Sequence, residues 1–143
     1  DRFLIMGAYN YKDEKLFNTF YIINQGRIIF SYDKTHLIPF FEIQHHCKRI
    51  FEKGNQLFLH QKEPFTRGSS SKKSFSINNS LSLTPLLCSE TFWSMPSQKT
   101  VVALVNDRYF TWSYFPLVMR LLAHFEALEK RSNLLYCSSR GAI

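Results

Sequence analysis

Short apolar runs that stop at polar residues restrict the fold of this chain more than any other feature of its sequence. Residues 3–9 form the first run and predict a buried strand, with a polar turn at residues 10–15. Residues 19–24 and 27–31 are rich in β-branched and aromatic side chains, and Gln25-Gly26 between them predicts a hairpin. The first part of the chain is therefore predicted to be β-structure.

The second half of the chain combines strands with one clear helical pattern. Residues 83–88 and 101–105 predict strands, and residues 134–137 predict a further one. Between the last two, apolar residues recur with helical spacing over residues 116–129, and Pro116 stands near the first turn, where its missing N–H does no harm. Because polar and reactive residues follow the strands, we expect a layered α/β domain with its site at strand ends.

Two stretches between these elements are less regular. Residues 42–53 predict an amphipathic helix that stops at Gly54. Residues 61–80 are polar and Ser-rich, and they predict a long loop that contains Lys72-Lys73. His45-His46-Cys47 suggests a metal site at first sight, but adjacent residues rarely converge on one ion, so no metal is predicted.

The composition limits the class of protein. With 143 residues the chain is long enough for one domain with its own core. A hydrophobic share of 45% and a charged share of 20% are typical of a folded chain. The net charge of +7 favours anionic partners, but the basic residues are scattered, so no nucleic acid is predicted. No apolar run reaches the ~18–20 residues of a membrane helix, and the three cysteines form no CxxC pair.

Two stretches far apart in the sequence carry groups that suggest chemistry. Residues 32–42 read Tyr-Asp-Lys-Thr-His-Leu-Ile-Pro-Phe-Phe-Glu and contain Lys34 and Glu42, whereas an apolar strand ends at Cys88 with Glu90 two residues on. A lysine favours the thiolate form of a cysteine and stabilises an oxyanion, and a carboxylate accepts the thiol proton. Together the groups predict a nucleophilic site. Taken singly, a solvated loop and a buried core cysteine are the simpler interpretations.

Six segments stand in one order along the chain: Met6–Tyr9, residues 32–42, Phe65–Gly68, Leu83–Glu90, Leu104–Phe110 and Ala123–Glu129. In order and spacing they resemble the motifs of bacterial apolipoprotein N-acyltransferases, a branch of the carbon–nitrogen hydrolase (nitrilase) superfamily. The second segment is similar to the branch's Tyr-x-Lys-x-His-Leu-Val-Pro-Phe-Gly-Glu motif, and the fourth is similar to its Pro-Leu-Ile-Cys-Tyr-Glu nucleophile strand.

The resemblance implies a fold and a set of site residues. The fold would be part of a four-layer α-β-β-α sandwich, with residues 1–143 as a partial nitrilase-like domain. The upstream part of that domain, with its general-base glutamate and a membrane-spanning region, would precede this sequence. Cys88 would be the acylated nucleophile and Lys34 the catalytic lysine. Glu42 and Glu90 would support the site, and no cofactor is implied.

The implied reaction moves a fatty acyl chain in two steps. The Cys88 thiolate would attack a phospholipid ester, which leaves a thioester on the protein, and the α-amine of the diacylglyceryl-cysteine of an apolipoprotein would then take the acyl chain as an amide. The implied location is the bacterial inner membrane, with the domain on the periplasmic side.

Two other interpretations of the same residues stay open. In the first, the protein is a soluble carbon–nitrogen hydrolase (an amidase or nitrilase), and water takes the acyl group from the cysteine. In the second, the chain is an inactive remnant of the fold. The departures from the motifs favour the remnant, since Phe41 replaces a glycine, Ser89 replaces a tyrosine and Glu126 replaces an arginine.

Overall fold

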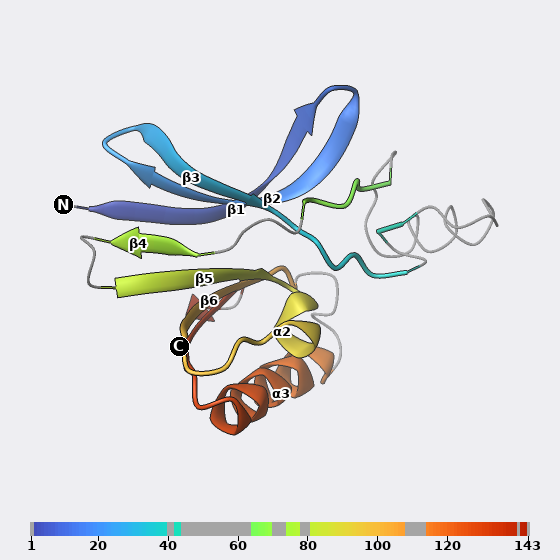
Figure 1. The fold of residues 1–143 in the computed structure, drawn as a ribbon. Helices are drawn as coiled ribbons and strands as arrows, with labels where there is room; N and C mark the ends of the chain where they lie inside the picture. The colour runs from blue at the N-terminus through green and yellow to red at the C-terminus, as the bar shows by residue number, and fades with distance from the viewer. Residues whose placement is uncertain are drawn as a thin grey trace.

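The computed structural model describes residues 2–39, 42–43, 64–69, 74–77, 81–107, 114–139 and 141–142. Within these residues the chain forms two β-sheets and two helices (Figure 1). The helix predicted over residues 42–53 lies outside the described residues, apart from Glu42 and Ile43. Phe41, His45-His46-Cys47 and Lys72-Lys73 also lie outside them.

The first sheet is an antiparallel meander of β1 (Phe3–Lys12), β2 (Lys15–Asn24) and β3 (Arg27–Asp33), in that order. Both connections are two-residue turns in which the central residues have positive φ. The angles are 50° and 56° at Asp13 and Glu14, and 49° and 76° at Gln25 and Gly26. Such turns match the twist of paired strands. The hairpin predicted at Gln25-Gly26 is confirmed.

The prediction for residues 3–15 was wrong in two respects. The strand continues through Lys12, so residues predicted as a polar turn pair with β2 instead. No residue of β1 is buried, and half-buried positions such as Phe3 and Ile5 alternate with exposed ones such as Leu4. The reason is its place at the edge of the sheet, where one face contacts the core and the other faces outward.

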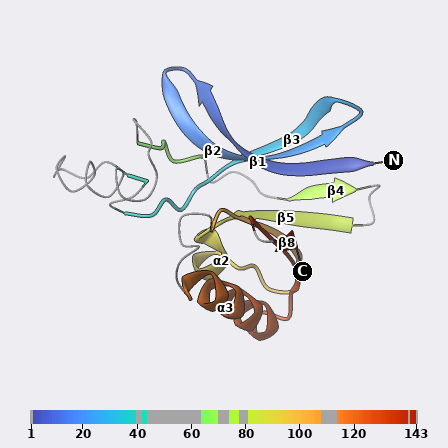
Figure 2. The same cartoon turned by 180° about the vertical axis from the view of Figure 1, so that it is seen from behind.

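The second sheet has the order β4-β5-β6-β7-β8. Its middle strands β5 (Leu81–Leu87), β6 (Thr100–Val105) and β7 (Asn133–Ser138) are parallel, whereas β4 (Phe75–Ile77) and β8 (Gly141–Ala142) pair antiparallel with the sheet's outer strands. Helix α2 (Glu90–Trp93) connects β5 to β6, and α3 (Phe115–Glu129) connects β6 to β7. Both helices lie on the same face of the sheet (Figure 2).

Most elements predicted in the second half of the chain are confirmed, namely the strands near 83–88, 101–105 and 134–137 and the helix over 116–129. The loop predicted over 61–80 was wrong in part, because it contains β4. Pro85 lies inside β5, but β4 pairs only with Leu81 to Leu83. In the described part of the chain, Pro85 therefore interrupts no hydrogen bond along that edge of the strand.

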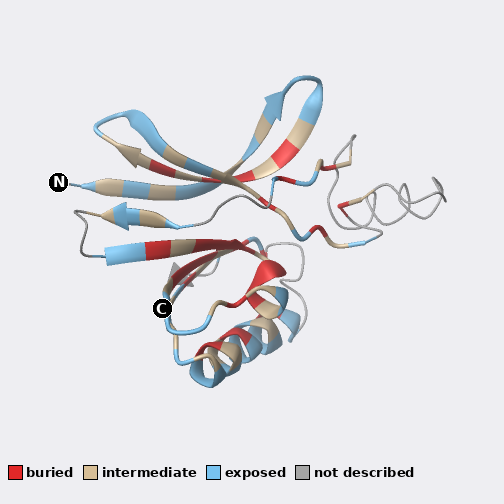
Figure 3. Ribbon diagram, viewed as in Figure 1, coloured by how far each residue is buried: buried red, intermediate tan, exposed pale blue. Residues whose placement is uncertain are grey.

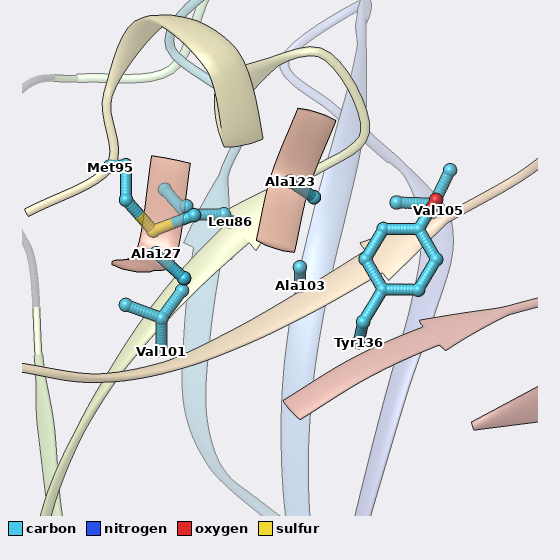
Figure 4. Packing of buried hydrophobic residues seen from close by; sticks show 8 residues of the cluster. All are labelled: Leu86, Met95, Val101, Ala103, Val105, Ala123, Ala127 and Tyr136. Carbon is cyan, nitrogen blue, oxygen red and sulfur yellow. The ribbon is translucent and has the colours of Figure 1, made fainter. Parts of the chain in front are cut away.

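Two apolar cores separate the layers. The first lies between the sheets, where Phe20 and Ile22 pack against Leu83, Leu87 and Val102. The second lies between the second sheet and the helices, and its members are Leu86, Met95, Val101, Ala103, Val105, Ala123, Ala127 and Tyr136 (Figure 4). Successive residues of β6 thus point to opposite cores, which explains why this strand is an unbroken apolar run. The described residues form a mixed α/β fold of sheet, sheet and helices. The fourth layer stays a prediction.

Helix α3 packs on the sheet through small residues. Ala123 and Ala127 are buried, and they allow the helix to approach the strands closely. The large apolar side chains that gave the helical spacing point outward, with Phe125 63% exposed and Leu128 78% exposed (Figure 3). The spacing predicted the helix correctly, but it did not indicate which face is buried.

Candidate active site

Cys88 lies on a sharp turn between β5 and α2, one residue beyond the predicted strand end. Its φ of 51° is in the left-handed region, which costs a non-glycine residue about 1–2 kcal/mol. The turn is held from both sides. The Cys88 N–H donates to the Leu104 carbonyl at 2.9 Å, and the Thr91 hydroxyl donates to the Cys88 carbonyl at 2.6 Å. Strained residues that are fixed by their neighbours in this way cluster at active sites.

The Cys88 side chain faces a cavity of about 520 Å³. The cavity lies at the carboxyl ends of the parallel strands β5, β6 and β7, which is where open α/β sheets bind ligands. Its lining is mainly apolar, with a few polar groups. The residues are Gly7, Ala8, Tyr9, Asn18, Ile38, Glu42, Leu87, Cys88, Leu104, Val105, Asn106, Asp107, Phe115, Met119, Cys137, Ser138 and Ser139. The volume is in the range of small-molecule sites.

Lys34 and Glu42 form a buried ion pair beside this cavity. Lys34 is fully buried, and its Nζ lies 2.6 Å from the Glu42 Oε2. The same carboxylate oxygen accepts a hydrogen bond from the Ile38 N–H at 2.7 Å, and the Glu42 N–H donates to the Ile38 carbonyl at 2.9 Å. The turn through Pro39 thus returns the chain to its own lysine. A buried charge is tolerated only when it is paired in this way.

Residues 64–69 close over the lysine from the other side. The Gly68 N–H donates to the Lys34 carbonyl at 2.9 Å, and the Thr66 N–H donates to the Leu16 carbonyl at 2.6 Å. A Cβ at Gly68 would lie 2.2 Å from the carbonyl oxygen of Asp33. Glycine is therefore required here by the close approach of two backbones.

Glu90 holds the lysine loop against the nucleophile strand. Its carboxylate is fully buried and accepts five hydrogen bonds. Four reach Oε1, from the Tyr32 hydroxyl, the Thr35 N–H and hydroxyl, and the His36 N–H, at 2.7 to 3.0 Å. The fifth comes from the Leu87 N–H to Oε2 at 3.0 Å. Glu90 does not line the cavity formed by the described residues. Its geometry is that of a positioning residue.

The environment of Cys88 disfavours the thiolate. Burial is the largest cause that raises the pKa of the Cys88 thiol, and the Glu42 and Asp107 carboxylates raise it further. The positive charge of Lys34 opposes them, and so does a hydrogen bond from the Ser89 N–H. Because the net shift is upward, the resting cysteine is protonated at neutral pH, and a proton acceptor is needed for attack.

The structure brings three of the four predicted site residues, Cys88, Lys34 and Glu42, to one place. Glu90 is close in sequence but turned into the interface between the two sheets. The sequence gave Asp107 no role, although it lines the cavity and is only 4% exposed. The available signal was an acidic residue directly after a β-branched strand.

Comparisons with known proteins agree with this geometry. No family model matches the sequence. Over 141 residues, or 96% of this chain, the sequence is 26% identical to an apolipoprotein N-acyltransferase from Wolinella succinogenes. The match spans 34% of that protein, so the chain covers about a third of its relative's length.

A solved structure shares the fold. It is a glutamine-dependent NAD⁺ synthetase from Acinetobacter baumannii in complex with ADP, with a TM-score of 0.60 and 14% identity over 95% of this chain and 24% of the synthetase chain. Together the two similarities suggest an enzyme of carbon–nitrogen hydrolase type. Neither helix in the described part of the chain has the length and apolar character needed to cross a membrane.

Proposed function

We propose that this chain carries the thioester-forming site of an N-acyltransferase, which moves a fatty acyl chain from a phospholipid to the N-terminal diacylglyceryl-cysteine of an apolipoprotein. The observation that carries the proposal is the strained cysteine in the same cavity as a buried lysine–glutamate pair. The apolar lining suits an acyl chain, and the similarity to an apolipoprotein N-acyltransferase supports this acceptor over water.

In the first step the Cys88 sulfur attacks the ester carbonyl of the phospholipid. The C–S bond forms, and the negative charge that develops on the carbonyl oxygen is stabilised by Lys34, which Glu42 holds in place. The C–O bond then breaks, and the lysophospholipid leaves as an alcohol with the proton of the thiol. The resemblance places the base that relays this proton in the part of the fold preceding this chain.

In the second step the acceptor amine attacks the thioester. The C–N bond forms, the C–S bond breaks with its electron pair on sulfur, and the thiol is restored. A thiol suits both steps because it attacks carbonyls readily and is a good leaving group from a thioester. With a phospholipid donor and a lipoprotein acceptor, the site would work at the periplasmic face of the bacterial inner membrane.

A labelling experiment with a fluorescent phospholipid tests the proposal. The protein should acquire a label that hydroxylamine removes, as a thioester requires, and peptide mapping should find it on Cys88 and not on Cys137. Cys88→Ala should abolish the label, and Lys34→Met should slow its appearance by about 100-fold or more. If the wild-type protein acquires no label under conditions in which it is folded, the proposal is wrong.

A further inference from the structure

Asp107 is a buried carboxylate in the cavity that the steps above do not use. It follows β6, it is 4% exposed, and its Oδ1 accepts a hydrogen bond from the Ser139 hydroxyl. The two other buried or half-buried carboxylates near the site, Glu42 and Asp33, are paired with Lys34 and Lys12. In the described part of the chain, no cation pairs with Asp107. A desolvated carboxylate without a cation is costly and calls for an explanation.

The effect of Asp107 on the nucleophile rules out a simple role in the first step. Its negative charge raises the pKa of the Cys88 thiol, which opposes formation of the attacking thiolate. It also raises the pKa of Tyr136, to about 12 together with burial, the larger cause. The conflict ends once the cysteine is acylated, because a thioester sulfur carries no charge. A carboxylate at this position is therefore compatible with the second step and unfavourable for the first.

We propose that Asp107 forms the acceptor site: it binds the ammonium form of a primary amine beside the acylated Cys88 and takes one of its protons. This inference rests on the proposed acyl transfer and adds a residue to it. The Asp107 oxygen that Ser139 leaves free receives a proton from the ammonium group. The resulting amine forms the C–N bond, the C–S bond breaks, and the amine's second departing proton neutralises the sulfur. The products are an amide, the Cys88 thiol and a protonated Asp107, so charge and protons balance.

The cavity around Asp107 fits this assignment. It holds two carboxylates, Glu42 and Asp107, and the nearby cation Lys34 is paired with Glu42. The site thus has an uncompensated negative charge although the whole chain has a net charge of +7. In a largely apolar cavity such a charge attracts a cationic group more strongly than it would in water. The remaining polar groups at this end, Asn106 and Ser138, border Asp107 and Ser139 in sequence and line the same cavity.

The two half-reactions can be measured separately in the full chain. The thioester is first formed with the fluorescent phospholipid and then chased with a synthetic peptide that carries an N-terminal S-diacylglyceryl-cysteine, or with hydroxylamine as an uncharged nucleophile. Asp107→Asn keeps the shape and an acceptor for Ser139 but removes the charge. We expect thioester formation at an undiminished rate, transfer to the peptide slowed by about 100-fold, and hydroxylamine cleavage changed by less than about 3-fold.

Each outcome decides the matter. The control Glu129→Gln, on the outer face of α3, should behave as wild type in all three assays. If Asp107→Asn forms the thioester and transfers it to the peptide at the wild-type rate, the inference is wrong while the proposed function stands. If the wild-type protein forms no thioester, both fail. If Asp107→Asn does not fold, Ser139→Ala retains the charge but releases its orientation, and transfer to the peptide should fall about 10-fold with thioester formation unchanged.

Discussion

Replacement of Glu90 by glutamine tests whether this residue positions the site or serves its chemistry. Glu90→Gln keeps the shape of the side chain but turns one carboxylate oxygen into an NH₂ donor. In the better orientation the amide oxygen keeps the four donors now at Oε1, and the NH₂ group faces the Leu87 N–H, 3.0 Å from the present Oε2. The substitution therefore loses one hydrogen bond to a charged acceptor, sets donor against donor, and weakens the others.

The expected cost follows from these contacts. A hydrogen bond to a charged group contributes about 1.5–3 kcal/mol, and each remaining bond loses part of its charge assistance. We expect the free energy of unfolding to fall by about 3 kcal/mol, a large share of the ~5–15 kcal/mol of a typical domain. For a chain of this size that corresponds to a Tm lower by roughly 10 °C.

Urea and thermal unfolding followed by circular dichroism provide the measurement. Glu129→Gln is the matched control, because its side chain is 56% exposed and its contact with Lys130, at 3.8 Å, is a surface ion pair worth less than about 1 kcal/mol. If Glu90→Gln unfolds together with this control, the argument from its five hydrogen bonds is refuted. If it also loses thioester labelling without losing stability, Glu90 acts in the chemistry directly.

Three further predictions concern the turn and its surroundings. Cys88→Gly should be more stable to urea than Cys88→Ala by about 1 kcal/mol, because glycine removes the left-handed strain; a more stable alanine variant would contradict the turn geometry. Gly68→Ala should cost about 2–3 kcal/mol by forcing its Cβ against the Asp33 carbonyl, whereas Gly7→Ala, whose Cβ would meet side chains at an ordinary 3.7 Å, should cost far less. Alkylation of Cys88 by iodoacetamide should reach half-maximal rate above the pH typical of a free cysteine, because its pKa is raised. Asp107→Asn should move this midpoint down, and an upward shift or none would count against the contribution of its charge.

Much of the fold could be predicted because its main elements have strong local signals. Gln25-Gly26 supplied the turn residues of a hairpin, and residues 101–105 and 116–129 carried clear strand and helix patterns. The strand β4 was missed because three residues carry no period of their own, and it exists through pairing with β5. Helix period also does not tell which face is covered. Here the face with Ala123 and Ala127 is buried since small side chains allow close packing.

The site was less predictable than the fold. The spacing of Lys34 and Glu42 suggested a pair, and the structure joins them. The role of Glu90 as a proton acceptor was inferred from its distance of two residues from Cys88, but the tight turn at Cys88 sends the intervening chain into α2 and points Glu90 to the other sheet. Asp107 depended on the register of β5 and β6, a tertiary property that no local pattern records.

The carboxylate of Glu90 also has a consequence for motion. It closes the amide protons of Thr35, His36 and Leu87 into one cluster that spans the two sheets. These protons cannot exchange with solvent one at a time, because opening any of them disturbs the others, so slow and concerted exchange is the signature of this junction. The loop that carries Lys34 cannot swing out alone. A substrate must then reach Cys88 through the mouth of the cavity, against walls that are already in place.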